Sequence, residues 1–424
     1  MPSRAPSPLP PRGPRRRGSN LPRVADYNQM LVLDLVRRSP GISRVELVRE
    51  TGLTAQTVSN ICRRLTEAEL IRETGRVSGA AGAPRTIFEV NGAGRYTIGL
   101  HIDPARLTFV ILTLAGDTVQ RLSMRTPDTP EPGAMLAEIE LRIRELIDAA
   151  DIPFVRVAAI GVATPGPIDV AQGSVRDAPN LPGWEDVALR EDLEERLGLP
   201  VVVEKDTTAA ALGELWSNPH PPQNFAFMYL GTGAGAGIVL DGEVRRGSSS
   251  NLGNIGHMSG DPNGPICPCG GRGCLSLTAL PATLVGEAAA RELVSPVDLG
   301  DARAVERALA ELCAAAAQRP GGDEAALIDR AARSYARVAG QLANALDLDA
   351  VIFGGPQWPA MMPSILRIAP PAIAKDFLFH ALHDVEVRGS SINDDVGAVG
   401  AASLAMWATT FDAPTQLFLP GRTG

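Results

Sequence analysis

The sequence predicts a small winged-helix domain followed by a larger α/β body, and three observations support this prediction. Residues 24–90 show three short helical patterns and then two β-like runs, which is the order of a winged helix. From Tyr96 onward, apolar strand patterns and amphipathic helical patterns follow one another, as in an α/β fold. Residues 1–95 hold 16 Arg against 8 Asp or Glu, whereas the remainder holds 24 basic against 40 acidic residues. A basic head on an acidic body indicates that only the head meets a polyanion.

The length of 424 residues suggests two or three domains, and the 45% of hydrophobic residues can fill large cores. No apolar run approaches the roughly 20 residues of a membrane span, so we expect no membrane partner. Residues 1–22 are rich in Pro and Arg without apolar periodicity, which predicts a disordered basic arm. This arm either reaches DNA phosphates or a minor groove, or is a solvated tail. The predicted boundaries are 23–92 for the winged helix, 93–409 for the body and 410–424 for a loose tail.

The winged-helix prediction rests on caps and spacing. A first helix spans about Val24–Arg37 and stops at a Ser-Pro-Gly sequence. Ser43 and Glu46 have the spacing of a capping box for a second helix that ends near Gly52. Thr54 caps a third helix, Ala55–Ala68, and two short helices joined by a Gly-containing turn are typical of a helix-turn-helix. The two β-like runs within Arg72–Val90 flank residues 78–85 and predict a wing.

The third helix presents short polar side chains and arginines on its outer faces. Such side chains reach base edges from the N-terminal end of a recognition helix, while arginines bind phosphate or guanine. We therefore expect a double-stranded DNA operator, with an inverted repeat, as the partner; the alternative is a helical domain used for protein contact. The predicted DNA-binding residues are Ser43, Arg44, Thr54, Gln56, Thr57, Ser59, Asn60, Arg63, Arg64 and, in the wing, Arg85.

A cluster of metal-ligand residues lies in the body. Three of the five cysteines, Cys267, Cys269 and Cys274, fall within eight positions, and His257 lies ten residues before the first of them. One His with three Cys completes the closed tetrahedral shell of a structural zinc ion, and the intervening glycines allow a tight turn. The alternatives are buried thiols with an incidental histidine, or a disulfide, which the lack of a secretory signal disfavours. The spacing predicts a structural Zn²⁺ in a zinc knuckle at 257–274.

This stretch resembles the zinc motif of the ROK family, which contains sugar kinases and sugar-responsive repressors. The family pattern is Gly-Glu-x-Gly-His followed by Cys-x-Cys-Gly-x-x-Gly-Cys-Leu-Glu, and here Asn254 and Ser276 replace the two sugar-binding glutamates. The resemblance covers essentially Val24 to Ala408 and implies an actin-like ATPase body, ribonuclease H-like, with two lobes. The winged helix resembles the N-terminal domain of ROK repressors, which the kinases lack.

The resemblance also implies an effector site. In the family, residues matching Gly166 and Asn180 line the sugar pocket, and the histidine matching His257 contacts sugar as well as zinc. Asp206 matches the base that removes the proton from the attacking sugar hydroxyl. Lys205 replaces a sugar-binding Asn: either it pairs with Asp206 or Glu204, which we favour, or it receives an acidic ligand. The expected effector-binding residues are Gly166, Asn180, Lys205, Asp206, Asn254, His257 and Ser276.

The nucleotide motifs are altered. The first phosphate loop of actin-like ATPases reads Asp-x-Gly-x-Thr, whereas this chain has Asp103-Pro104-Ala105-Arg106, which lacks an amide and the Gly-Thr end. Gly231–Ile238 resembles the second phosphate loop, and Gly354-Gly355 resembles the turn that touches adenosine. We assign no catalytic residue, regard Asp206 as vestigial, and do not expect ATP as a cofactor.

Three functions fit these observations. The first, which we favour, is a ROK-type transcriptional regulator, a repressor whose body binds a sugar-like or other small effector, acting as a homodimer or homotetramer in the bacterial cytoplasm at the nucleoid. The second is an active ATP-dependent sugar kinase that carries a DNA-binding head. The third is a redox or zinc sensor, which a closed four-ligand shell disfavours.

Overall fold

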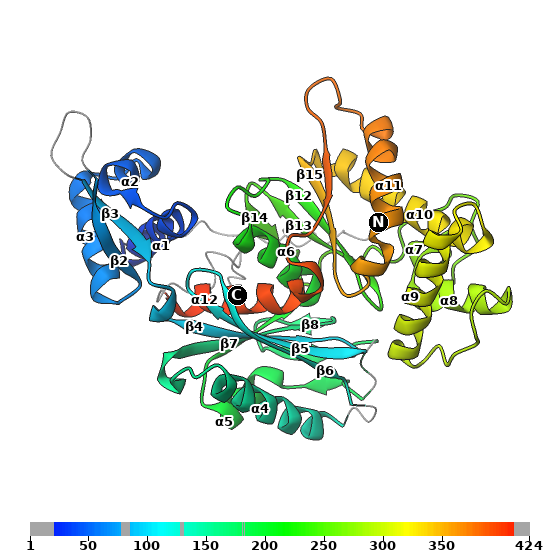
Figure 1. Ribbon diagram of the computed structural model, residues 1–424, viewed down its shortest axis with the longest axis horizontal. Coiled ribbons are helices and arrows are strands. Elements are labelled where there is room, and N and C mark those ends of the chain that lie inside the picture. Colours follow the sequence, from blue (N-terminus) through cyan, green and yellow to red (C-terminus); the bar gives the residue numbers. More distant parts are fainter. Residues whose placement is uncertain (1–20, 78–84, 128–130, 180, 182, 411–424) are drawn as a thin grey trace, which may run out of the picture.

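The computed structural model describes residues 21–77, 85–127, 131–179, 181 and 183–410. The chain forms a winged-helix head and a body of two α/β lobes (Figure 1). Most of the predicted arm and tail, the tip of the predicted wing and Asn180 lie outside the described residues. Within the described residues, no helix combines the length and apolar character needed to cross a membrane.

The head has the predicted order of elements. Both hydrogen bonds of the capping box are present at Ser43, and Gly52 ends the second helix with a left-handed φ of 68°. Thr54 caps the third helix by accepting from the Thr57 N–H. The first helix begins at Leu21, so the predicted arm 1–22 is too long by two residues. The elements are α1 (Leu21–Arg38), β1 (Ile42–Ser43), α2 (Arg44–Thr51), α3 (Ala55–Glu67), β2 (Ile71–Val77) and β3 (Arg85–Val90), and the sheet order is β1-β3-β2.

Lobe 1 is a five-stranded sheet in the order β11-β7-β4-β5-β6. Strands β4, β5 and β6 form an antiparallel meander. Strand β7 pairs in parallel with β4, and β11 pairs in parallel with β7. Helices α4 and α5 cover one face, and α12 covers the other (Figure 1). The bounds are β4 (Tyr96–Ile102), β5 (Arg106–Thr113), β6 (Thr118–Arg125), α4 (Pro132–Ala149), β7 (Val157–Thr164), α5 (Leu189–Leu197), β11 (Val201–Lys205) and α12 (Val396–Thr410).

Lobe 2 repeats this plan in the order β14-β13-β12-β15-β16. Its strands are β12 (Phe225–Leu230), β13 (Ala234–Leu240), β14 (Glu243–Arg245), β15 (Ala350–Gly354) and β16 (Glu386–Gly389). Its helices are α6 (Asp206–Ser217), α7 (Leu275–Thr278), α8 (Pro281–Ala290), α9 (Ala302–Gln318), α10 (Asp323–Leu346) and α11 (Trp358–Asp376). The turn predicted at Gly231–Ile238 is shorter, because β13 already begins at Ala234. Two five-stranded sheets of the same plan confirm the expected two-lobed, actin-like body.

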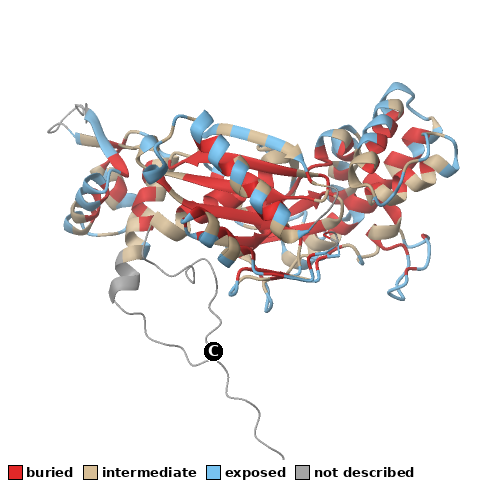
Figure 2. Ribbon diagram, turned by 90° about the horizontal axis from the view of Figure 1, so that it is seen from below, coloured by how far each residue is buried: buried red, intermediate tan, exposed pale blue. Residues whose placement is uncertain are grey.

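Short elements complete the chain. They are η1 (Gly92–Gly94), η2 (Phe154–Arg156), η3 (Asn393–Asp395), and a small sheet of β8 (Ile168–Asp169), β9 (Ser174–Arg176) and β10 (Asp186–Val187). The two lobes meet where α6 packs on α12, and a Cβ on Gly400 would lie 1.7 Å from the Ala209 carbonyl oxygen. Only glycine permits this approach. Buried residues form a band through the middle of the body (Figure 2).

The head packs on the body through a shared apolar cluster. Val36 of α1 belongs to the same buried cluster as Leu112 of β5, Trp216 of α6 and Met406 of α12. The Arg37 guanidinium lies 4.0 Å from the centroid of the Trp216 ring, and its Nη1 donates to the Trp216 carbonyl oxygen at 2.7 Å. The end of α6 is therefore in direct contact with the head.

Candidate effector cavity, metal cluster and DNA-binding face

A cavity of about 540 Å³ lies between the two lobes. Loops after β4, β7 and β11 line it from lobe 1, and the β12–β13 turn and the segment that leads to the cysteine cluster line it from lobe 2. Of the seven predicted effector residues, the structure brings six to this cavity, and Asn180 lies outside the described residues. The six are Gly166, Lys205, Asp206, Asn254, His257 and Ser276.

Two carboxyl groups on the lobe 1 side of the cavity have perturbed proton affinities. Asp206 accepts a hydrogen bond from the Thr207 N–H at 2.7 Å, and Asp103 accepts one from the Ala105 N–H at 2.8 Å. Burial raises the pKa of Asp206 to about 6 and that of Asp103 to about 7. A carboxyl group with this proton affinity can exchange a proton with a ligand near neutral pH, as a general base does.

The predicted ion pair of Lys205 is wrong. Glu204 is instead held by Arg246, whose Nε lies 2.7 Å from Oε2 of Glu204, with both side chains buried. The Lys205 Nζ donates to the carbonyl oxygens of Asn251 at 3.3 Å and Leu252 at 3.0 Å. Burial lowers the pKa of this ammonium group. Backbone carbonyls partly solvate the charge of Lys205 without neutralising it.

The altered phosphate loop carries a link between the lobes. Arg106 donates from Nη1 to Asp394 at 3.0 Å and from Nη2 to Glu306 at 3.1 Å. The same Nη2 donates to the carbonyl oxygen of Pro356, in the turn after β15, at 3.2 Å. A guanidinium bonded to lobe 2 therefore extends from the segment that matches the Gly-x-Thr part of the family motif.

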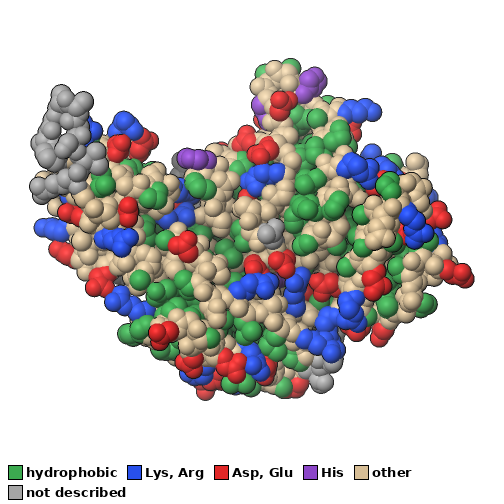
Figure 3. Space-filling model, in the orientation of Figure 1, with side chains coloured by type: hydrophobic (Ala, Val, Ile, Leu, Met, Phe, Trp, Pro, Cys, Tyr) green, Lys and Arg blue, Asp and Glu red, His purple; other side chains and the backbone are tan. Residues whose placement is uncertain are grey.

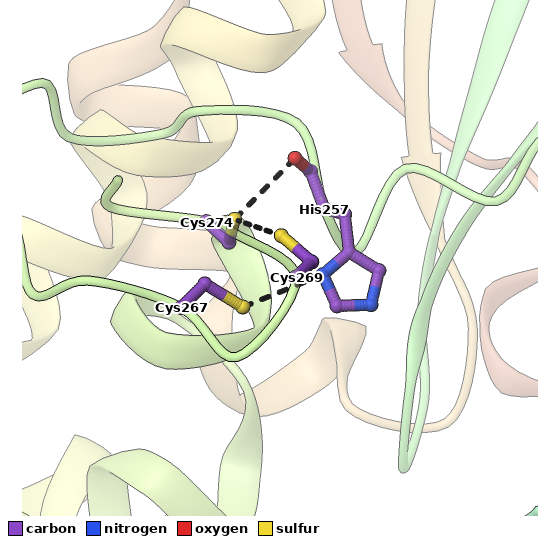
Figure 4. Close-up of side chains that lie close together, drawn as sticks. All are labelled: His257, Cys267, Cys269 and Cys274. Carbon is purple, nitrogen blue, oxygen red and sulfur yellow. Dashed lines mark hydrogen bonds between the residues drawn. The ribbon is translucent and has the colours of Figure 1, made fainter. Parts of the chain in front are cut away.

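The four predicted metal ligands converge (Figure 4). One ligand atom from each of them lies within 4.8 Å of all the others. The Sγ atoms of Cys269 and Cys274 are 3.6 Å apart, and Cys267 Sγ lies 3.5 Å from His257 Nδ1. Tetrahedral zinc with bonds of about 2.3 Å requires sulfur atoms about 3.8 Å apart, so the cluster is compatible with a structural zinc ion.

Glycine geometry brings these ligands together. Gly273 has a φ of +59°, and a Cβ there would lie 1.5 Å from the Asp261 carbonyl oxygen. Only glycine fits this crossing of two backbone segments, as the sequence predicted for this turn. All five cysteines are free thiols, so the disulfide alternative does not apply.

The recognition helix presents most of the predicted DNA-binding residues to solvent. Thr54, Gln56, Arg63 and Arg64 are exposed, as is Arg85 at the start of β3. Arg44, Thr57, Ser59 and Asn60 are half-buried. The predicted DNA contact of Ser43 is corrected by the structure. Ser43 is only 3% exposed, and its hydroxyl donates to Glu46 in the capping box, so it does not face a ligand.

Thr207 and Asn251 are among the cavity residues that were not predicted. Thr207 follows Asp206 in the first turn of α6, and Asn251 holds the loop after β7 through two hydrogen bonds of 2.8 Å to the backbone of Ile168. Proximity to Asp206 was a signal for Thr207. No local pattern marks Asn251, because its partner is 83 residues away.

A winged-helix head on a two-lobed actin-like body, with a His-Cys cluster beside the interlobe cavity, defines a class of protein. The ROK family model matches residues 97–407, and a MarR family model matches residues 20–79. The chain therefore belongs to the ROK family and carries a MarR-type winged helix.

Curated relatives include repressors and kinases. The chain is 30% identical over 253 residues to the putative xylose repressor of Caldicellulosiruptor sp. strain Rt8B.4, covering 59% of this chain and 63% of that one. It is 28% identical over 261 residues to the xylose repressor of Bacillus subtilis strain 168, covering 60% and 66%. These matches span a little under two thirds of each relative. The glucokinase of Halalkalibacterium halodurans is 28% identical over 319 residues, covering 73% and 94%.

Solved structures similar to this chain also include a regulator and a kinase. A ROK family transcriptional regulator, described as a homologue of the E. coli MLC protein, matches with a TM-score of 0.70 and 25% identity, covering 94% of this chain and 100% of that chain. The ROK hexokinase of Thermus thermophilus matches with a TM-score of 0.55 and 27% identity, covering 73% and 97%. The regulator match extends over 94% of this chain, whereas the kinase match extends over 73%.

Proposed function

We propose that this protein is an effector-responsive transcriptional repressor of ROK type. The observation that carries the proposal is the winged-helix head packed on α6, the helix whose first residues line the interlobe cavity. Relatives named xylose repressor and a similar ROK transcriptional regulator support it. A DNA-binding repressor of this kind acts in the bacterial cytoplasm, at the nucleoid.

DNA reading is assigned to the exposed face of α3 and to the wing. Gln56 and Asn60 lie one turn apart, with their amide groups 3.3 Å from each other, and offer donors and acceptors to base edges. Arg63, Arg64 and Arg85 supply phosphate contacts. The viewed face mixes side chains of both signs over the head and over the body (Figure 3). Two heads of a homodimer or homotetramer would read half-sites about 34–36 Å apart, as an inverted repeat.

Helix α6 connects the cavity to the head. It begins at Asp206 in the cavity wall and carries Trp216 near its other end, under the Arg37 guanidinium. Twelve residues at about 1.5 Å each give a rigid element of roughly 18 Å. A ligand that shifts the first turn of α6 therefore shifts the surface on which the head rests, and this changes the spacing of paired heads.

The His-Cys cluster is assigned to one structural Zn²⁺ per chain. His257, Cys267, Cys269 and Cys274 would hold the ion, which supplies a rigid crosslink within the segment between β14 and α7. His257 also lines the cavity, so metal binding fixes the orientation of a ligand-facing ring. A closed shell of four protein ligands favours this structural role over a sensing role.

A second candidate function is a sugar kinase, because Asp206 lies in the cavity with a pKa of about 6. Phosphoryl transfer depends mainly on positioning and on charge stabilisation around the phosphates. Here Arg106 fills the end of the first phosphate loop with a guanidinium that is bonded to Glu306 and Asp394. We therefore place kinase activity second.

The test begins with mapping of bound genomic sites, followed by anisotropy titrations on one recovered site. Arg64→Ala should weaken binding to specific and unrelated DNA alike and lower the salt slope by about 0.9, the value for one lost phosphate contact. Arg367→Ala, at an exposed position of α11, is the matched control. If both variants and the wild type bound DNA with equal affinity, the assignment of α3 to the DNA interface would be wrong.

A further inference from the structure

The junction between β11 and α6 brings three consecutive residues, Lys205, Asp206 and Thr207, to the wall of the interlobe cavity. Thr207 is 2% exposed, and its Oγ1 has no hydrogen-bond partner among the described residues. A buried hydroxyl without a partner costs roughly 1–3 kcal/mol. Thr207 therefore brings an unused hydrogen-bonding group to the lining of the cavity.

Lys205 adds a buried positive charge at the same place. It is 9% exposed, and within the described part of the chain no carboxylate lies within 4.0 Å of its Nζ. Its two carbonyl acceptors leave one N–H of the ammonium group available. Lys205 is also the N-cap residue of α6 and makes no side-chain cap there, so the positive end of this twelve-residue helix adds to the charge of the ammonium group.

The remaining ionisable groups of the cavity wall are Asp103, Asp177, Asp206, Tyr229 and His257. Burial raises the pKa values of Asp103 and Asp206, so both carboxyl groups take up protons in mildly acidic solution and become hydrogen-bond donors. Asp177 is exposed. Among the described lining residues Lys205 is the only Lys or Arg, which suits one negative charge and disfavours a dianion.

The cavity also has neutral hydrogen-bonding side chains. Asn254, Ser276 and Thr232 line it, and these side chains offer donors and acceptors to hydroxyl groups without repelling an anion. The cavity therefore combines one buried ammonium group with neutral polar groups that suit hydroxyls.

We propose that the effector is a polyhydroxy carboxylic acid, such as a uronate or an aldonate, whose carboxylate binds Lys205 Nζ and Thr207 Oγ1 while its hydroxyl groups bind Asn254, Ser276 and Thr232. This inference rests on the proposed function, because it names the class of ligand for the effector cavity of that repressor. The single carboxylate satisfies both the buried ammonium and the buried hydroxyl.

The test is direct calorimetry on the full chain without DNA, with glucuronate, gluconate, glucose and glucose 6-phosphate as probes. We expect saturable binding of glucuronate or gluconate and weaker binding of glucose. Lys205→Met should weaken binding of the acid by about tenfold or more, the loss expected for a charge-assisted hydrogen bond. Lys375→Met is the matched control, because Lys375 is exposed on α11 and is the only other lysine in the sequence.

A second variant and a pH series test the proposal independently, in case Lys205→Met does not fold. Thr207→Val removes the hydroxyl and keeps the shape, so it should weaken the acid more than glucose. Binding of the acid should also tighten from about pH 8 to about pH 6, as Asp103 and Asp206 gain protons, while binding of glucose changes little. Glucose or glucose 6-phosphate binding more tightly than both acids, or no acid binding at all, overturns the inference. If the wild-type protein bound no specific DNA site, the proposed function would be overturned instead, so the two failures are distinguishable.

Discussion

Replacing Asp103 by Asn should stabilise the protein, and increasingly so as the pH rises. Asp103 is buried, and its carboxyl group accepts a hydrogen bond from the Ala105 N–H, which an Asn oxygen can also accept. Burial raises its pKa from 3.8 to about 7. The unfolded chain releases this proton near pH 4, whereas the folded protein keeps it until about pH 7, so the stability associated with the protonated group is lost as pH rises through that interval.

The size of the effect follows from the same values. A tenfold difference in proton affinity corresponds to about 1.4 kcal/mol, so the full loss attributable to Asp103 approaches about 4 kcal/mol above pH 7. Between about pH 6 and pH 8 the loss is about 1.4 kcal/mol for Asp103. For Asp206, whose pKa is about 6, it is only about 0.4 kcal/mol. Asp103 therefore dominates this window.

The assay is urea unfolding of wild type and Asp103→Asn at about pH 6, 7 and 8, with intrinsic fluorescence as the signal. The difference in unfolding free energy between variant and wild type should grow by about 1.4 kcal/mol across the series. Asp148→Asn, at an exposed position of α4, is the matched control and should show a constant difference. A constant difference for Asp103→Asn as well would refute the assignment of a perturbed proton affinity to this carboxyl group.

Three further outcomes are expected. Cys269→Ser should lose bound zinc and melt at a lower temperature, whereas Cys313→Ser, outside the cluster, should retain the metal; full zinc content in both variants by metal analysis would contradict the assignment. Arg37→Gln should leave ligand affinity intact but reduce the effect of ligand on DNA binding in anisotropy titrations, because the contact with Trp216 is lost. Coupled ADP-release assays over hexoses should show little turnover; a rate of about 1–10³ s⁻¹ that Asp206→Asn abolishes would establish the kinase instead.

Local sequence determined much of this protein. The helices of the head follow from caps that act over three or four residues, and the capping box at Ser43 is present as the pattern predicts. The spacing of Cys267, Cys269 and Cys274 with their glycines predicted a cluster, and the four side chains do converge. The resemblance placed Gly166, Lys205 and the other described effector residues at one cavity, since motifs after successive strands of such a fold gather at one edge.

Tertiary structure alone decided the partners of the charged groups. Arg246 is 42 residues from Glu204, and it takes the carboxylate that sequence proximity had given to Lys205. Arg106 meets Glu306 and Asp394 across separations of 200 and 288 residues. Residue pattern fixes which face of a helix or strand is buried, but an ion pair depends on which backbone and side-chain atoms the packed lobes bring within about 3 Å. The absence of a carboxylate within 4.0 Å of Lys205 Nζ among the described residues, and with it the class of ligand that we infer, is a property of that packing.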